Sequence, residues 1–381
     1  MTESLSPGVY IEETQTPIKR IEGVDTQTAL LIGVTDKGPD LPAAVTDYAA
    51  FVDAFGAQVS EPAAAIRKSW MANDEGGQWW QFSSSVKGFF DNGGQQAVIK
   101  RIPANSPEDL APENFVDAIQ SLSDAAEFIL CTTPGMWSSK IQAALIERCE
   151  STGACFAILD PPPALDIAGI SAFRRQRSSS YAALYHPWLN VDGVEIAPSG
   201  HLAGIYSRSD RTRGVHKAPA NEEILGINKL AREVSNAEQA LLNQEGINAL
   251  RFFPGHGNRV WGARTLSPDP EFRYVNVRRL LIYFERSIEK GTQWVVFEPN
   301  NEQTWANVRA AVSDFLVNAW RNGALMGQTP EKAFFVKCDR TTMTQNDLDN
   351  GRLICLIGVA VVKPAEFVIF RIGQWTAEAQ A

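Results

Sequence analysis

The sequence lacks the short motifs on which most enzyme families build their chemistry. It contains no GxxxxGK[ST] phosphate-binding loop, no GxSxG nucleophile motif and no HExxH zinc-binding motif. The nearest match to a dinucleotide-binding fingerprint, at residues 255–260, lacks the third glycine that such a fingerprint needs. We therefore expect no catalytic residue, no cofactor-binding residue, no metal-binding residue and no cofactor.

Histidine is scarce, with four residues in the whole chain. His186, His201, His216 and His256 are widely spaced, and each lies in a segment rich in proline or glycine. Catalytic sites form in space and not in sequence order, so a site that includes His201, Asp210 and His256 stays open as an alternative. We prefer the interpretation that these imidazoles hydrogen-bond the backbone of loops.

Cysteine does not occur at any spacing typical of metal sites. The cysteines are odd in number and form neither a CxxC pair nor a cluster with histidine. They are Cys131, Cys149, Cys155, Cys338 and Cys355. Several of them stand beside apolar residues, where cysteine behaves as a small hydrophobic residue. We predict buried, reduced thiols.

The sequence has too little positive charge for a typical nucleic-acid-binding protein and no apolar run long enough for a typical membrane protein. Lysine and arginine number 35 against 44 aspartates and glutamates, which gives a net charge of -9. Such a field repels phosphate backbones, and no apolar run approaches the roughly 20 residues that span a bilayer. Glu3 also stands where a signal peptide would be basic. We expect no nucleic-acid partner, no direct membrane insertion, and folding in the cytoplasm.

What the sequence does contain is an alternation of apolar strands and amphipathic helices. The 381 residues suffice for two domains, and 44% hydrophobic residues are ordinary for a folded protein. Continuous apolar runs at residues 29–34, 97–99, 128–131 and 155–159 are separated by helical patterns. Buried strands alternating with helices indicate a parallel sheet covered on both faces. We predict an α/β domain with a mostly parallel sheet over residues 23–245.

The last third of the chain has a different pattern and predicts an α+β domain over residues 246–381. Apolar residues recur at helical spacing over residues 275–289 and 304–322. Strands are predicted at residues 294–297, 333–336 and 353–362. Residues 198–221 show neither a helical nor a strand period, so we predict an extended loop there, shortly before the domain boundary.

Two strand-like segments at the ends of the chain have no obvious partner in their own domain. Residues 7–13 are cut off by a polar linker, and residues 366–372 are apolar on both faces. A lone strand cannot satisfy its own backbone groups, so it frays or pairs with another sheet edge. We predict extended arms over residues 1–22 and about 364–381. Their strand residues are Val9, Tyr10, Ile11, Glu12, Phe367, Val368, Ile369 and Phe370.

Several segments resemble the phage tail sheath family, in the order in which that family shows them. They lie at residues 7–13, 198–221, 247–251 and 260–266. The family's signature loop, here named the signature segment (residues 198–221), is matched by Pro198, Gly200, Gly204, Asp210, Arg211, Gly214, Lys217, Ala218, Pro219 and Asn221. A motif that the resemblance assigns to the inner domain is matched by Trp261, Gly262, Arg264 and Thr265. The resemblance spans nearly the whole chain.

The resemblance implies a structural subunit and not an enzyme. Members of the family polymerise helically around an inner tube and contract to drive that tube through a target envelope. The implied partners are further copies of the chain, the tube protein, and baseplate and terminator proteins. The terminal arms would link neighbours by strand exchange with the inner domain. Assembly would take place in the bacterial cytoplasm, and the product would be part of a virion or injection particle.

Two other classes of protein stay open at this point. A soluble α/β enzyme would need a deep pocket with convergent titratable groups. A non-contractile tail or shell protein would share the acidic composition, but not the signature segment together with both arms. The charged run at residues 208–213 fits either an anion site or an ion-pair loop, because arginine binds phosphate and carboxylate equally well.

Overall fold

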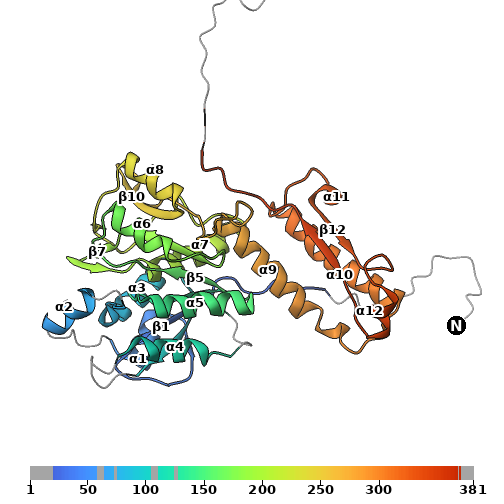
Figure 1. The fold of residues 1–381 in the computed structure, drawn as a ribbon, viewed down its shortest axis with the longest axis horizontal. Helices are drawn as coiled ribbons and strands as arrows, with labels where there is room; N and C mark the ends of the chain where they lie inside the picture. Colours follow the sequence, from blue (N-terminus) through green and yellow to red (C-terminus); the bar gives the residue numbers. More distant parts are fainter. Residues whose placement is uncertain are drawn as a thin grey trace, which may run out of the picture. The chain divides into compact units, whose positions relative to one another are not determined.

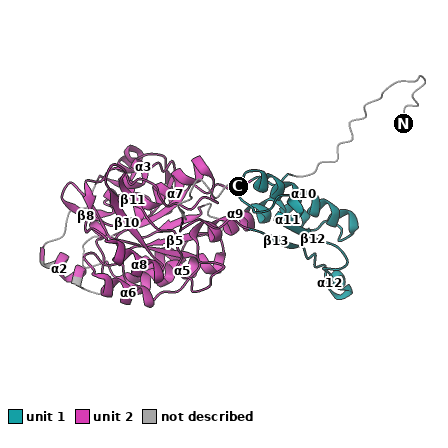
Figure 2. Cartoon of the chain, turned by 90° about the horizontal axis from the view of Figure 1, so that it is seen from above, with its two compact units in different colours: residues 1–22, 287–360 teal, residues 23–286, 361–381 magenta. Residues whose placement is uncertain are grey.

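The structure is a computed structural model that describes residues 20–57, 64–72, 75–103, 110–123, 128–367 and 369. The chain divides into two compact units, which are coloured separately in Figure 2. The large unit comprises residues 23–286 and 361–381, and the small unit comprises residues 1–22 and 287–360. Within the described part of the chain, no helix is both long enough and apolar enough to cross a membrane.

The large unit is built on an eight-stranded sheet (Figure 1). Its order is β11 (Gly257–Val260), β10 (Ile247–Phe253), β6 (Ala182–His186), β5 (Phe156–Leu159), β4 (Leu130–Thr132), β1 (Ala29–Val34), β3 (Ala97–Ile102) and β2 (Ala43–Val45). The inner strands are all parallel, and one antiparallel strand lies at each edge. The prediction of an α/β unit with a mostly parallel sheet is confirmed.

Helices cover both faces of this sheet because its strands carry apolar side chains on both faces. Every residue of β1 is buried, with Leu31 in the core on one side of the sheet and Leu30 in the core on the other. The first core is completed by α1 (Tyr48–Phe55), α3 (Phe82–Asp91) and α7 (Ser199–Arg213). The second is completed by α4 (Pro112–Gln120), α5 (Ser139–Thr152), α6 (Ile167–Arg175) and α8 (Asn236–Gln244).

The prediction of an extended loop over residues 198–221 is wrong for most of its length. Residues 199–213 form α7, which packs in the interior between α3 and the sheet. Nearly every residue from Ser199 to Asp210 is buried, so the helix has no polar face that would produce a periodic pattern. Its glycines, serines and charged residues therefore give no helical pattern in the sequence, although the segment is a core helix.

Two glycines of the signature segment let α7 lie very close to α3. A Cβ atom at Gly204 would lie 2.2 Å from the carbonyl oxygen of Phe89, and one at Gly200 would lie 2.4 Å from that of Ser85. Gly200 and Gly204 are four residues apart and so lie on one face of the helix. Since Cβ atoms do not approach backbone oxygens this closely, any larger residue must push the helices apart.

The division between the units falls later in the chain than the sequence predicts. The predicted boundary lies at residues 245 and 246, whereas the compact units divide after Arg286, within α9 (Val275–Gly291). The physical reason is that β10 begins at Ile247 and pairs in parallel with β6, which makes it part of the large sheet. The predicted helix at residues 275–289 is confirmed as α9.

The small unit consists of helices beside a two-stranded antiparallel sheet. The predicted helix at residues 304–322 is confirmed as α10 (Glu302–Arg321), whose first turn is capped by the side chain of Asn301. The remaining elements are η3 (Gln293–Val295), α11 (Pro330–Ala333), β12 (Phe334–Lys337), α12 (Gln345–Asp349) and β13 (Leu356–Val359). The strand predicted at residues 294–297 is wrong, because that stretch begins with the turn η3.

We predict that Gly204→Ala lowers the free energy of unfolding by about 1–3 kcal/mol, because its methyl group forces α7 away from α3. Chemical denaturation of the unassembled chain, followed by circular dichroism, measures the change. Arg211→Ala is the matched control, since Arg211 is exposed on the same helix, and it should cost less than about 0.5 kcal/mol. Equal stability of the two variants would contradict the close contact.

Candidate functional site

A buried ion pair joins the signature segment to α9. The carboxylate of Asp210, near the end of α7, accepts hydrogen bonds from Arg279 at 2.9 Å (Nη1) and 2.5 Å (Nη2). The exposed fractions of the two side chains are 1% and 0%. Two parallel charge-assisted bonds make this the strong form of an arginine–carboxylate contact. Of the two interpretations of the charged run, the ion pair therefore holds for Asp210.

Aromatic and backbone groups complete the surroundings of Arg279. Its Nη2 also donates to the carbonyl oxygen of Thr26 at 3.3 Å, and its guanidinium carbon lies 4.9 Å from the centre of the Tyr206 ring. The hydroxyl of Tyr206 shares a hydrogen bond of 2.6 Å with that of Tyr185 on β6. Burial raises the pKa of both phenols, so both stay protonated. The ion pair is thus linked to the middle of the sheet.

The residues at the two ends of α7 shape its backbone. Pro198 stands directly before the helix. Gly214 ends the helix with a φ of +87°, a conformation that favours glycine, and its N–H donates to the carbonyl oxygen of Asp210 at 2.8 Å. Arg211 is exposed, unlike the residues before it. Most of the signature residues on α7 therefore serve the fold and not the surface.

The last part of the signature segment runs along β11. Ala218 and Pro219 are buried, and the ammonium group of Lys217 donates to the carbonyl oxygen of Ala220 at 2.9 Å. Burial lowers the pKa of Lys217. Asn221 has a φ of +58°, and its N–H donates to a carbonyl oxygen of β11 at 2.8 Å. These contacts fix the segment to the edge of the large sheet.

A second ion pair holds the start of the predicted C-terminal arm. Arg264 donates to the carboxylate of Glu366 at 2.9 Å from Nε and at 2.5 Å from Nη2. The exposed fractions of the two side chains are 13% and 16%. The hydroxyl of Tyr274 donates to the same carboxylate at 3.3 Å. This contact raises the pKa of Arg264, which stays charged.

The motif around Arg264 belongs to the large unit, and not to a separate domain with the small sheet. Asn248 on β10 accepts a hydrogen bond from the N–H of Arg264 at 2.6 Å and donates to its carbonyl oxygen at 2.8 Å. Gly262 permits this approach, because a Cβ there would lie 2.8 Å from Oδ1 of Asn248. Thr265 is buried and Trp261 is 38% exposed. The motif therefore does not share a compact unit with the small sheet, and its assignment to the inner domain stays a prediction.

Most of the predicted arm residues lie outside the described residues. Those are Val9, Tyr10, Ile11, Glu12, Val368 and Phe370. Phe367 and Ile369 are described, and they are 74% and 78% exposed. Phe367 directly follows Glu366, so an exposed apolar side chain comes immediately after the anchored residue. The assignment of these residues to intersubunit contacts stays a prediction.

The two-stranded sheet of the small unit also carries exposed apolar side chains. β12 and β13 pair antiparallel over their whole length. Phe335, Leu356 and Ile357 are 52%, 50% and 37% exposed. A sheet of two strands is marginally stable by itself, and its unpaired backbone groups can accept a further strand.

One open cavity of about 890 Å³ lies in the large unit. It is bordered by α2 (Ala64–Ala72), α3, and the hairpin of β7 (Leu189–Val191) and β8 (Val194–Ile196). His201 contributes to its wall, whereas Asp210 is paired with Arg279 and His256 lies in the turn between β10 and β11. The structure thus does not bring together the three groups that the enzyme alternative required.

The partners in both ion pairs were not predictable from the sequence. Arg279 is 69 residues from Asp210, and Glu366 is 102 residues from Arg264. The sequence gives one relevant signal, because a charged residue among buried neighbours needs a partner. No spacing rule selects that partner across such distances. Nor does the sequence indicate that the fold brings Cys131, Cys149 and Cys155 together.

Comparison with known proteins decides the family. The model of the phage tail sheath protein central domain matches residues 111–266, and that of the phage tail sheath C-terminal domain matches residues 267–374. A solved sheath chain, from an extracellular contractile injection system (PVC) in its contracted state, is 30% identical with a TM-score of 0.79, and the match covers 100% of both chains. The chain belongs to the phage tail sheath family. This sheath family is structural, so the resemblance and the prediction of a non-enzyme are confirmed.

Other sheath proteins agree with this assignment. The helical sheath of the anti-feeding prophage in its contracted state is 28% identical, with a TM-score of 0.75 and coverage of 98% of this chain. A putative prophage major tail sheath protein of Pseudomonas aeruginosa is 26% identical over 65% of this chain and 66% of its own length. The tail sheath protein of Enterobacteria phage T4 is 28% identical over 50% of this chain, which is 30% of the phage protein. The chain thus spans only part of these curated relatives.

We predict that Asp210→Ala lowers the free energy of unfolding by about 3–5 kcal/mol, because it leaves Arg279 charged and buried. Chemical denaturation of the unassembled chain measures the loss. Glu113→Ala is the control, since its pair with Lys140 is exposed (59% and 57%) and solvent screens it, so the loss should be much smaller. A loss for Asp210→Ala no larger than that of the control would show that the buried pair does not stabilise the fold.

We predict that His201 makes the chain sensitive to acid. Burial lowers its pKa from 6.5 to about 4, helped by Lys87 and opposed by Asp91. Below pH 6.5 the unfolded chain binds a proton at His201, whereas the folded chain does so only near pH 4. The free energy of unfolding therefore falls by about 3 kcal/mol as the pH drops from 6.5 toward 4. Unfolding free energies measured across that range should fall less steeply for His201→Gln, while exposed His256→Gln should follow the wild type. Parallel curves for all three proteins would refute the assignment.

Proposed function

We propose that this chain is the sheath subunit of a contractile injection particle. It polymerises helically around an inner tube and contracts to drive that tube through a target envelope. The observation that carries this proposal is the full-length match to sheath chains solved in the contracted state. The family models support it independently over residues 111–374.

Strand exchange between neighbours is the linkage that this proposal assigns to the arms. Two surfaces support it: the open two-stranded sheet β12–β13, and the exposed Phe367 and Ile369 beyond the anchored Glu366. Adding a strand to a sheet edge satisfies backbone groups on both partners and needs no side-chain chemistry. Neighbours would then stay joined while their other contacts change.

The partners of the proposed sheath follow from its place in the particle. They are further copies of the chain, the inner tube, and baseplate and terminator proteins. A chain in a solved baseplate structure of the anti-feeding prophage is 28% identical with a TM-score of 0.74, which supports the baseplate as a partner. Assembly takes place in the bacterial cytoplasm, and the finished sheath is part of a virion or injection particle.

Contraction in this proposal is driven by energy stored during assembly. An extended lattice that is less stable than the contracted one releases free energy when subunits repack, so the subunit itself hydrolyses no nucleotide. A particle that contracted only during nucleotide hydrolysis would rule this out.

We predict that deletion of residues 1–13, or of residues 368–381, gives a folded monomer that no longer forms sheath. Each deletion removes a strand proposed to pair with a neighbour, and the second keeps the Arg264–Glu366 pair. Electron microscopy and size-exclusion chromatography of the variants and of the full chain measure assembly, while circular dichroism checks folding. Unfolded variants would place the strands in their own domain, and normal tubules would eliminate the strand-exchange role.

A further inference from the structure

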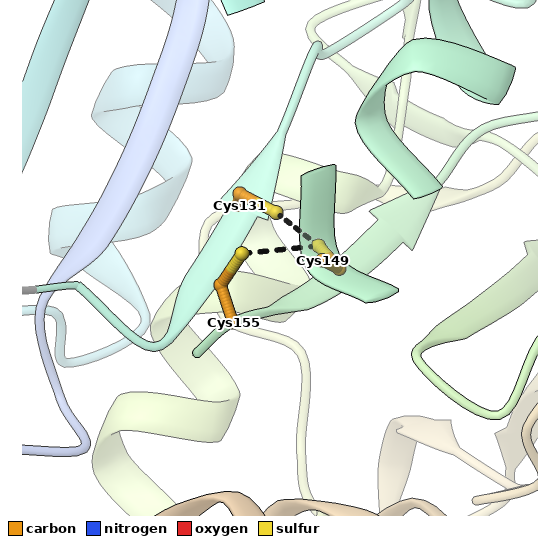
Figure 3. A group of neighbouring side chains, drawn as sticks. All are labelled: Cys131, Cys149 and Cys155. Carbon is orange, nitrogen blue, oxygen red and sulfur yellow. Dashed lines mark hydrogen bonds between the residues drawn. The ribbon is translucent and has the colours of Figure 1, made fainter. Parts of the chain in front are cut away.

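Three cysteines that are distant in sequence converge in the core of the large unit (Figure 3). Cys131 lies on β4, Cys149 near the end of α5, and Cys155 directly before β5. The Sγ atom of Cys149 lies 3.2 Å from that of Cys131 and 3.1 Å from that of Cys155. All three sulfur atoms lie within 4.8 Å of one another, and all three residues are buried. The side chains point toward a common centre.

This arrangement differs from ordinary packing of cysteine as a small hydrophobic residue. Single buried cysteines contact hydrocarbon, whereas each of these contacts another sulfur. The three sulfur atoms therefore form one polar cluster within the apolar core.

A positive charge lies close to the cluster. The guanidinium group of Arg148 interacts electrostatically with Cys131 and Cys155. It is held in place by hydrogen bonds to the carbonyl oxygens of Leu122, at 2.9 Å, and Ser123, at 2.7 Å. Three thiolates around a divalent ion carry one net negative charge, and Arg148 offsets that charge. A monovalent ion would leave a further negative charge in the core, which is unfavourable.

We propose that Cys131, Cys149 and Cys155 form a three-thiolate site for a soft divalent ion of the Zn²⁺ and Cd²⁺ type. Thiolate sulfur is the ligand that selects such ions, and three protein ligands with one further open position form a known type of zinc site. A metal–sulfur distance of about 2.3 Å places three sulfurs about 4.0 Å apart in a planar arrangement. The two short separations in the cluster therefore need to widen by less than about 1 Å.

Binding at this site exchanges protons for metal and involves no oxidation. One divalent ion displaces the protons that the three thiols still carry, and these protons pass to solvent, so affinity rises with pH. Thr152 and Gly153 are half-buried in the turn after α5, between Cys149 and Cys155 in the chain, and this turn is the route that we assign to the ion. A bound ion ties the end of α5 to β4 and β5, and so stabilises the large unit.

Titration of the full, reduced chain with Cd²⁺ under nitrogen tests the proposal. We expect one ion per chain, detected by the ultraviolet charge-transfer absorption of cadmium–thiolate bonds, and a rise in the thermal midpoint. Cys149→Ser should weaken binding by at least about 100-fold, because it removes the sulfur between the other two. Cys355→Ser is the matched control and should bind as the wild type does, since Cys355 lies in the small unit.

A measurement on the wild type alone keeps the test valid if Cys149→Ser does not fold. Cd²⁺ should protect Cys131, Cys149 and Cys155 from alkylation in peptide mass spectrometry, and leave Cys338 and Cys355 unprotected. Absence of the absorption band, or protection of the wrong cysteines, would overturn the proposal. A disulfide found between Cys149 and either neighbour in protein purified without oxidant would also overturn it, in favour of a redox role.

Discussion

The large unit depends on the buried pair between Asp210 and Arg279. It joins α7, which fills the interior on one face of the sheet, to α9, the helix within which the chain leaves the large unit. Two charges removed from water stabilise a fold only when each finds its partner in good geometry. Neither charge can be buried until α7, α9 and the Tyr185–Tyr206 contact are all in place. Formation of the pair therefore requires the native arrangement of these elements.

The residue types of the signature segment are explained by its contacts in the interior of the large unit. Gly200 and Gly204 set the distance between α7 and α3, and Asp210 forms the contact of α7 with α9. Gly214 then allows the chain to turn, and the rest of the segment follows the sheet edge. In the proposed contraction, the subunit would have to keep its shape while its contacts with neighbours change. Residues that fix the interior of the large unit meet that requirement.

The sequence predicts those parts of the fold in which one-dimensional patterns survive. Continuous apolar runs identified β1, β4 and β5, and amphipathic spacing identified α9 and α10. The helix α7 was not predicted, because burial on all sides removes the helical periodicity of apolar and polar residues. The boundary was placed too early because only the pairing of β10 with β6 shows which sheet it joins.

The candidate site was less predictable, because its contacts join residues far apart in the chain. The signature residues were located by resemblance, but their roles follow from partners such as Arg279, Glu366 and Asn248, which no local pattern selects. The three cysteines show the same limit. Their spacing in sequence matches no metal motif, and only the packing of α5 against β4 and β5 brings their sulfur atoms together.

If the C-terminal arm links subunits as proposed, the anchor at Glu366 determines where mechanical load enters the subunit. A pull on the exposed residues after Glu366 acts first on its bidentate contact with Arg264. The backbone of Arg264 is held on both sides by Asn248, so the force passes into β10 and across the hydrogen bonds that join it to β6. Tension on the C-terminal arm would thus be borne by the large sheet, and the arm could transmit displacement between subunits without unravelling the unit from which it starts.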